Sequence, residues 1–204
     1  MSTKGKLIVF EGLDGSGKTL VASMVAERLR AMGFDVVVSW EPRFEEYKSL
    51  IGSLPRDSDE APFIEALLFA ADRLLHYVEI VRPALEEGKV VLLDRYYYSS
   101  MAYQGSRGVP LDWIREINKY VPRPDLAIYL DVPPEEGLRR KHGSTWRRFE
   151  EIGILERVRE TYLSLVEAGE LRLVDATRSP KEVVEEVMGL LEPLLGGLGR
   201  SPAE

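Results

Sequence analysis

The sequence has no cysteine and only two histidines, His76 and His142. Disulfides and thiol chemistry are therefore excluded, and a metal site built from cysteine and histidine is not expected. No apolar run approaches the roughly 20 residues of a membrane span, and the first residues lead directly into a strand pattern rather than a cleavable apolar segment. We expect a cytoplasmic protein with no membrane partner.

Positive charge is also scarce relative to negative charge: 27 Lys and Arg face 34 Asp and Glu, for a formal net charge of −7 at pH 7. Proteins that bind nucleic acid or anionic lipid nonspecifically need a basic surface that displaces counterions. Nucleic acid is therefore not an expected partner. Any polyanion that the protein does bind must meet positive charge gathered at one place.

Short aliphatic runs alternate with longer helical patterns along the 204 residues. This alternation is typical of βαβ units and a parallel sheet, and runs that are apolar throughout fit strands buried on both faces. We expect one α/β domain over residues 1–195, with a flexible tail at 196–204. The predicted strands are 7–10, 35–40, 90–94, 126–132 and 171–176.

The helical patterns between these runs differ in length. The pattern over 61–88 is the longest, and Pro83 is expected to kink it before it ends at Gly88. The aromatic segment DRYYYSSMAYQG, at 94–105, is interpreted as a turn region past the third strand. The other predicted helices are 18–33, 110–119, 134–141, 150–168 and 179–195.

The segment GLDGSGKT, at 12–19, matches the pattern G-x-x-x-x-G-K-[ST] in full, with a predicted strand before it and a helix after it. Its backbone N–H groups suit phosphate oxygens, Lys18 suits the terminal phosphates and Thr19 suits Mg²⁺. The alternative is a glycine-rich turn without a ligand. The motif predicts a P-loop NTPase-type three-layer fold, with a nucleoside triphosphate bound by Gly12, Asp14, Gly15, Ser16, Gly17, Lys18 and Thr19.

The loop leaves three classes of protein open: a GTPase, a motor-type ATPase and a kinase for a small acceptor. A GTPase is disfavoured because NKYV, at 118–121, lacks the Asp of the guanine-reading pattern N-K-x-D and precedes its strand. A mechanical ATPase would normally have more domains than 204 residues provide. A small-molecule kinase remains.

Two further residue pairs fit a kinase. Asp94 and Arg95 follow the third strand, where an Asp can hold water around Mg²⁺ and an Arg can grip phosphate; the alternative is a solvated ion pair. Phe69 and Arg73 lie four positions apart on one helix face, which would allow stacking on a base and hydrogen bonding to its edge. From the residues alone, the simpler interpretation of this second pair is a core phenylalanine and a surface salt bridge.

Several segments, in order and at matching spacing, together resemble the thymidylate kinase (dTMP kinase) family over roughly residues 6–176. They are FEGLDGSGKT, EP at 41–42, LLFAADR at 67–73, DRYYYSSMAYQG at 94–105, LDVPPEEGLRR at 130–140 and RFEEIGILERVRETYLSL at 148–165. The resemblance implies transfer of the γ-phosphoryl of Mg·ATP to dTMP, giving ADP and dTDP for dTTP synthesis. It also implies nucleoside monophosphate kinase architecture, with a five-stranded parallel sheet and a lid, and a homodimer.

The same resemblance implies a role for each residue on the acceptor side. Arg95 would bind the phosphate of the acceptor near the transfer path, and Asp14 would bind the 3′-hydroxyl of the acceptor. Both are expected to be catalytic, as is Lys18. Phe69 would stack on thymine and Arg73 would donate to its O4. The rest of the dTMP site would be formed by Ser99, Ser100, Tyr103 and Gln104, and the metal site by Thr19 and Asp94.

Gly15 bears on how the transferred charge is neutralised. Some members of the family have an arginine at this position, whereas others leave it small and bring arginines from a mobile lid. The expected lid, about 139–149, is basic, so a catalytic role is predicted for it here; the alternative is a solvated basic loop. Its expected catalytic residues are Arg139, Arg147 and Arg148, with Arg140 and Lys141 beside them.

One departure from the family pattern follows the second strand. Many relatives read R-E-P-G-G-T there, whereas this chain reads WEPRF, in which Glu41 and Pro42 match and Arg43 and Phe44 replace the glycines. Arg43 is expected to take over the lost contact to dTMP; the alternative is an exposed arginine without that role.

The long helix has more apolar residues than one buried face requires, which suits a subunit contact or further core. Two other functions stay open. One is a kinase for a different nucleotide or nucleoside, and the other is an ATP-bound switch that transfers nothing.

Overall fold

A five-stranded sheet, with its strands in the order β2-β3-β1-β4-β5, lies at the centre of the molecule. The computed structural model describes residues 5–54, 58–140, 148–196 and 198, without the side chains of 148–151. Every pairing in the sheet is parallel, which confirms the expected α/β class. The strands are β1 (Lys6–Glu11), β2 (Val36–Trp40), β3 (Val90–Asp94), β4 (Leu126–Asp131) and β5 (Arg172–Asp175).

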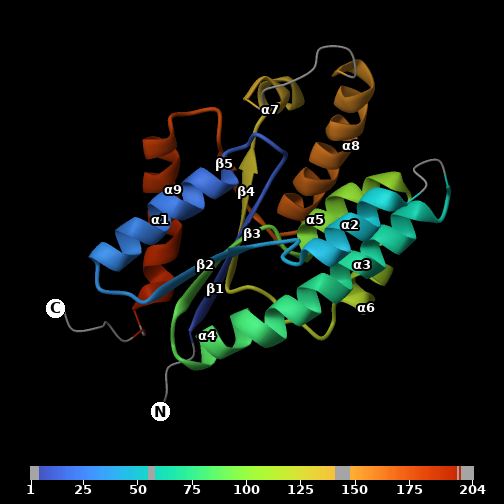
Figure 1. Cartoon of the computed structure of the whole chain (residues 1–204). Helices are drawn as coiled ribbons and strands as arrows, with labels where there is room; N and C mark the ends of the chain where they lie inside the picture. The colour runs from blue at the N-terminus through green and yellow to red at the C-terminus, as the bar shows by residue number, and fades with distance from the viewer. Residues whose placement is uncertain (1–4, 55–57, 141–147, 197, 199–204) are drawn as a thin grey trace.

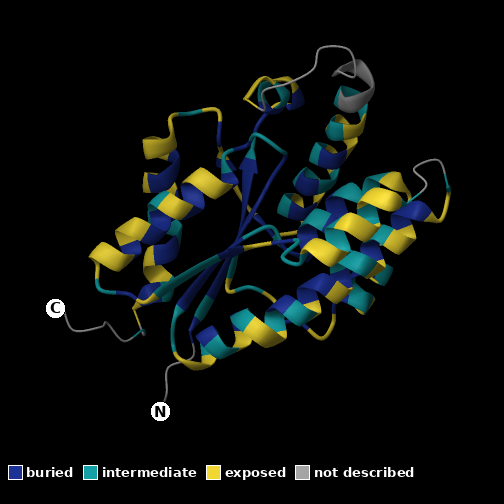
Figure 2. Ribbon diagram, in the orientation of Figure 1, coloured by how far each residue is buried: buried dark blue, intermediate teal, exposed yellow. Residues whose placement is uncertain are grey.

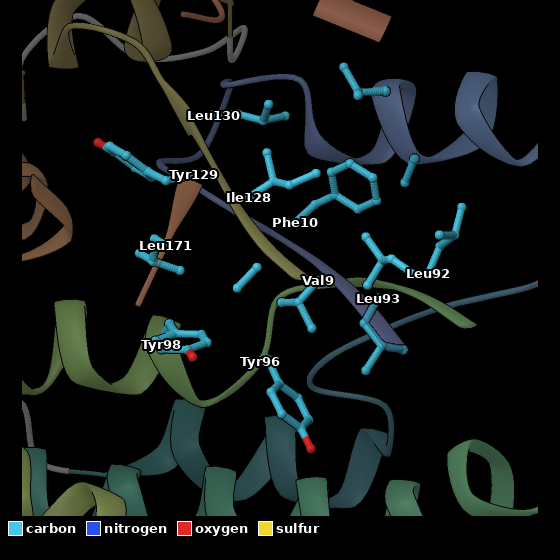
Figure 3. Close-up of a cluster of buried hydrophobic side chains, with 14 of the residues drawn as sticks. Val9, Phe10, Leu92, Leu93, Tyr96, Tyr98, Ile128, Tyr129, Leu130 and Leu171 are labelled. Atoms are coloured by element: carbon cyan, nitrogen blue, oxygen red, sulfur yellow. The ribbon is translucent and has the colours of Figure 1, made fainter. Parts of the chain in front are cut away.

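The inner strands form the core because helices cover both faces of the sheet. Successive side chains of a strand point to opposite faces: Figure 3 shows Phe10 and Ile128 directed towards the first helix, whereas Val9 and Leu93 point the other way. All four are fully or almost fully buried. Figure 2 shows that the inner strands β1, β3 and β4 are mostly buried, whereas the helices around them expose their outer sides. An unbroken aliphatic run therefore provides apolar side chains that pack against the helices on both faces of the sheet.

Two groups of helices form the outer layers (Figure 1). Helices α1 and α9 pack together on one face of the sheet, and α3 to α6 and α8 lie on the other. The six predicted helical patterns are all found as helix. The α-helices are α1 (Lys18–Ala31), α2 (Glu45–Ser53), α3 (Ala61–His76), α4 (Arg82–Glu86), α5 (Tyr97–Tyr103), α6 (Leu111–Ile117), α7 (Pro134–Arg140), α8 (Arg148–Glu167) and α9 (Pro180–Leu195).

The interpretation of the aromatic segment as a turn region is wrong, because residues 97–103 form α5 and a 3-10 turn follows at Gly105–Arg107. The first turn of α5 is stabilised by a distant carboxylate: Glu11 accepts hydrogen bonds from the backbone N–H groups of Tyr96 and Ser99. Side-chain acceptors at helix N-termini satisfy donors that have no partner within the helix. Helix α2 was not predicted either.

The long helical segment changes its geometry just before Pro83. Helix α3 continues into a π-helical turn, η1 (Tyr77–Val81), and then into α4. Proline lacks an N–H donor and its ring crowds the carbonyl four residues earlier, and a widened turn at this place accommodates both effects. A kink of the helix axis at Pro83 stays a prediction. None of the helices that the structure describes combines the length and apolar character needed to cross a bilayer.

Candidate active site

The phosphate loop lies between β1 and α1, as its sequence predicts. Lys18 is buried, and its ammonium donates hydrogen bonds to the carbonyl oxygens of Gly12 at 3.0 Å and Leu13 at 2.9 Å. Burial, and next the positive charge of Arg95, lower the pKa of Lys18 from 10.5 to about 8. The lysine is therefore held over the loop in a setting that favours arrival of a negative charge.

Gly15 is the point where the loop touches α7. It has φ of +83°, and a Cβ built on it would lie 2.1 Å from the carbonyl oxygen of Gly137. Any larger residue would have to push α7 away in addition to adopting a left-handed backbone. An arginine at this position is thus excluded by backbone contact.

The two residues expected to serve a metal ion are in direct contact. Thr19 Oγ1 donates to Asp94 Oδ2 at 2.5 Å, and the other oxygen, Asp94 Oδ1, is buried with no hydrogen-bond partner among the described residues. No group of three or more His, Asp or Glu side chains in the described parts of the chain could hold a metal by itself. A hydroxyl and one unsatisfied carboxylate oxygen fit Mg²⁺, which keeps most of its ligands as waters and phosphate oxygens.

Arg95 faces the phosphate loop from the start of α5. It is the only residue other than glycine with positive φ in the described chain, at 76°, and its N–H donates to the carbonyl of Phe10 at 2.9 Å. Its guanidinium pairs with Asp14, donates to Ser99 Oγ at 3.1 Å and lies 5.3 Å from the centre of the Tyr103 ring. The fold therefore brings Arg95 together with Asp14, Ser99 and Tyr103, four residues expected to bind the acceptor.

Glu11 connects these elements, although no sequence motif marks it as a site residue. Besides the two amides of α5, its carboxylate accepts from Ser99 Oγ at 2.6 Å and from Tyr162 Oη, in α8, at 2.9 Å. Burial raises the pKa of the Glu11 carboxyl, although these hydrogen bonds oppose the rise. A charged residue inside the apolar run LIVFE was the available signal, since a buried acid needs partners.

A cavity of about 800 Å³ opens over the phosphate loop. Asp94 and Arg95 line it together with loop residues 14–19. Its opposite wall is formed by residues that the sequence analysis did not assign to a site, although they follow β5 at the strand ends where open parallel sheets bind ligands. These residues are Ala176, Arg178, Pro180 and Val183.

The two described lid arginines differ in position. Arg140 lines the cavity, and it donates to the carbonyl of Ala176 at 3.0 Å and to Glu136 at 2.8 Å. Arg139 also pairs with Glu136, but 72% of its side chain is exposed and it does not line this cavity. Arg147 and the side chain of Arg148 lie outside the described residues.

Arg73 is buried, and only 2% of its surface is exposed. Its Nε donates to Glu41 Oε2 at 2.7 Å, and its Nη1 donates to Asn118 Oδ1 at 2.7 Å. The simpler interpretation, a surface salt bridge, is therefore wrong for Arg73. Phe69, one helical turn earlier, is half-buried.

The remaining predicted acceptor residues have other immediate neighbours. Ser100 and Gln104 are buried on α5 and just after it, and Gln104 Nε2 donates to Glu65 at 3.1 Å. The Arg43 guanidinium lies 4.4 Å from the centre of the Trp40 ring, and the backbone N–H of Arg43 donates to Asp72 at 2.8 Å. The stacking on Trp40 at the end of β2 is what the structure shows for Arg43, so its contact with dTMP stays a prediction.

Comparisons with known proteins identify one family. A sequence model of the family described as "Thymidylate kinase" matches residues 10–187. The chain is 45% identical to the "Probable thymidylate kinase" of Pyrococcus abyssi (strain GE5 / Orsay) over 207 residues, covering 96% of this chain and 100% of that protein. It is 43% identical to the "Probable thymidylate kinase" of Staphylothermus marinus over 185 residues, with 90% and 92% covered. It is 39% identical to the "Thymidylate kinase" of Xylella fastidiosa (strain M12) over 201 residues, with 96% and 92% covered.

Proposed function

The chain belongs to the thymidylate kinase family, and from that premise we propose that it transfers the γ-phosphoryl group of ATP to dTMP, giving ADP and dTDP. In this step an oxygen of the dTMP phosphate bonds to the γ-phosphorus. The bond from that phosphorus to the β–γ bridging oxygen breaks, and ADP keeps the electron pair. The enzyme is a dTMP kinase that supplies dTTP synthesis.

The observation that carries the proposal is the position of Arg95. Its guanidinium lines the same cavity as Lys18 and pairs with Asp14, a residue of the phosphate loop itself. Lys18 is suited to the terminal phosphates of one nucleotide, and a cation fixed beside it is suited to the phosphate of a second nucleotide. Transfer between two nucleotides requires their phosphates to lie this close together. Phosphoryl transfer is catalysed mainly by such positioning and by cations on the developing charge.

The donor side follows from the cavity. The phosphates of ATP are assigned to the loop, with Lys18 on the terminal phosphates, and the nucleoside to the wall formed by Arg140, Ala176 and Arg178. Thr19 and Asp94 are the residues that would hold Mg²⁺. When bound, Mg²⁺ neutralises charge on the β- and γ-phosphate oxygens. Arginines 139, 147 and 148 of the lid, about residues 139–149, are assigned to the transferred phosphoryl group, and closure of the lid to the exclusion of water.

On the acceptor side, Arg95 is assigned to the dTMP phosphate and Asp14 to the 3′-hydroxyl. Tyr103, whose buried hydroxyl has no hydrogen-bond partner in the described part of the chain, is assigned to the deoxyribose. Phe69 is assigned to stacking on thymine, and one edge of Arg73 to its O4. The polar surroundings of the acceptor are assigned to Ser99, Ser100, Gln104 and Arg43.

We further propose a homodimer formed through α3 and η1. Four large apolar side chains along this helical stretch are 38–49% exposed, and they repeat at the three-, seven- and four-residue intervals of one helix face. A contiguous apolar stripe of this kind is typical of a contact between subunits. The four residues are Ile64, Leu67, Leu74 and Val78. We place this dimer in the cytoplasm and, from the acidic balance of the chain, assign it no nucleic-acid partner.

Coupled ADP release tests the proposal directly. With Mg·ATP, turnover is measured for dTMP, dUMP, dCMP, UMP, AMP and thymidine, and is repeated with Arg73→Ala. Strong preference for dTMP that collapses in the variant is expected, because the base contact is assigned to Arg73. A folded, ATP-binding protein with no acceptor-dependent turnover would instead be an ATP-bound switch.

A further inference from the structure

A chain of buried polar side chains surrounds Arg73. Ser39, Glu41, His76 and Asn118 are each at most 6% exposed, and Arg73 is 2% exposed. They come from β2, the loop after β2, α3 and the C-terminal end of α6. A polar network buried at this depth is costly unless every member is satisfied, so its geometry is tightly specified.

Arg73 is fixed from three directions. Glu41 accepts a hydrogen bond of 2.7 Å from Arg73 Nε, and Asn118 accepts one of 2.7 Å from Arg73 Nη1. The ring of Tyr96 lies 5.6 Å from the guanidinium carbon. Because Nη2 takes part in neither of these two hydrogen bonds, the network sets the plane of the guanidinium while leaving one nitrogen for another acceptor.

Asn118 is itself oriented by a second contact. Its Nδ2 donates to the carbonyl oxygen of Ile114 at 2.8 Å, one turn earlier in α6. This bond fixes which end of the amide faces Arg73, and so presents Oδ1 as the acceptor. The tetrapeptide NKYV, which fails as a guanine-reading motif, thus contributes its asparagine to the support of Arg73.

His76 holds the other oxygen of Glu41. Its Nδ1 lies 3.3 Å from Glu41 Oε1, and its Nε2 lies 2.8 Å from Ser39 Oγ. Since an ionised carboxylate can only accept, the proton in the first contact belongs to Nδ1. Nε2 shares its hydrogen bond with the Ser39 hydroxyl, so both ring nitrogens of His76 have a partner.

We propose that Asn118 and His76 are positioning residues that hold Arg73 in the orientation needed to donate to a pyrimidine carbonyl at position 4. This inference rests on the proposed function, because it takes dTMP as the acceptor. A free arginine loses rotamer entropy when it is ordered, whereas Arg73 is already ordered before any base arrives. An orientation fixed by folding also penalises a base that presents an amino group, since a donor then meets a donor.

The test separates base reading from general stability. In Asn118→Ala, the ratio of kcat/KM for dTMP to that for dCMP, which has an amino group at position 4, is expected to fall about tenfold. The ratio for dTMP to dUMP, which keeps the carbonyl, is expected to stay within about twofold, as is the KM for ATP, because the donor lies elsewhere. The KM for dTMP should rise in Asn118→Ala, and this rise should account for most of the fall in kcat/KM for dTMP.

Ile114→Val is the matched control. Ile114 is a fully buried residue of the same helix, and its link to the network is its backbone carbonyl, which accepts from Asn118. The substitution shortens the side chain by one methylene and keeps that carbonyl, so it lowers stability without removing a hydrogen bond of the network. A second pair of variants tests His76: His76→Ala should lower the dTMP to dCMP ratio, and His76→Asn, which keeps a donor near the place of Nδ1, should restore part of it.

Two results would overturn the inference: equal loss of both base ratios in Asn118→Ala, or the same loss in Ile114→Val at an equal fall in Tm. If Asn118→Ala does not fold, an unchanged dTMP to dCMP ratio in His76→Ala would overturn it as well. A wild-type protein that never turns over dTMP would contradict the proposed function instead.

Discussion

The hydroxyl of Tyr162 donates a hydrogen bond of 2.9 Å to Oε2 of Glu11, across 151 positions of the chain. Tyr162 lies on α8, the helix that follows the proposed lid, and Glu11 is the last residue of β1 before the phosphate loop. Ser99 Oγ donates to the same carboxylate oxygen and accepts from Arg95. One buried carboxylate therefore connects the helix after the lid to the cation proposed to bind dTMP.

Removing the Tyr162 hydroxyl should loosen Arg95. Tyr162→Phe keeps the stacking of this ring on Tyr129, at 4.6 Å between centroids, but takes one donor from Glu11 and one neighbour from Ser99. We expect kcat with dTMP to fall about tenfold, because a hydrogen bond to a charged group is worth about 1.5–3 kcal/mol. Steady-state kinetics with dTMP as the varied substrate measures this fall in kcat.

Tyr97→Phe is the control for that experiment, since it also removes one hydroxyl, here bonded to Tyr98 at 3.0 Å. This variant should keep nearly full activity. A Tyr162→Phe enzyme as active as Tyr97→Phe would show that the Glu11 junction does not position Arg95.

Gly15→Ala should damage both folding and ATP use. Its Cβ would meet the Gly137 carbonyl 2.1 Å away, and its φ of +83° costs a further 1–3 kcal/mol, to order of magnitude, for a residue with a side chain. We expect a lower Tm and a kcat/KM for ATP reduced at least about tenfold, as α7 is pushed from the loop.

Gly108→Ala separates the two effects. Gly108 also has a left-handed backbone, with φ of +94°, but nothing lies within 4 Å of its added Cβ. It should lose stability and keep its KM for ATP. Comparable kinetic damage in both variants would rule out the contact with α7 as the cause.

Asp94→Asn should weaken the response to Mg²⁺. The carboxylate has one oxygen on Thr19 and one buried oxygen without a partner in the described residues, so the loss of its charge removes the main attraction for a cation. The Mg²⁺ concentration for half-maximal activity should rise about tenfold or more. Titration of chelator-treated enzyme with Mg²⁺ measures this concentration. The control is Asp131→Asn, because Asp131 is also a carboxylate at a strand end but is bound by Arg159. This variant should behave as the wild type.

Lys18 should make stability depend on pH in a defined direction. Its pKa is about 8 in the folded chain, against 10.5 ordinarily. The unfolded chain therefore binds more protons between these values, and the destabilisation present below pH 8 fades as pH rises towards 10.5. Relative to Lys18→Met, the wild-type free energy of unfolding should gain about 2 kcal/mol between pH 7 and pH 10. Denaturant unfolding at several pH values measures the difference, which would stay constant if burial did not lower this pKa.

Leu74→Glu should separate the proposed dimer. Leu74 is 38% exposed at the middle of the stripe, and a carboxylate there would have to be buried unpaired in a subunit contact. Sedimentation at micromolar concentration should show a dimer for the wild type and a monomer for the variant. Met32→Glu, at a residue 41% exposed after α1 and off the stripe, should remain dimeric. A wild-type monomer would contradict the dimer itself.

Local sequence patterns are sufficient to predict the strands, the phosphate loop and seven of the nine described α-helices, with α3 and α4 in one long pattern. Each of these features depends on residues that are close together along the chain. Apolar runs predict strands buried on both faces, helical periodicity predicts the helices, and one contiguous glycine-rich motif predicts the phosphate loop. Asp94 and Arg95 are predicted as site residues for the same reason, since ligands of open parallel sheets bind at the carboxyl ends of the strands.

The tertiary structure alone decided what depends on residues far apart. Helix α5 forms where a turn was expected because Glu11, 85 positions before Tyr96, accepts its first N–H groups. Arg73 is buried because Glu41 and Asn118, which are 32 and 45 positions away, satisfy its guanidinium. No local pattern encodes such partners, since a buried charge is stable only where the fold brings its hydrogen-bond acceptors to it.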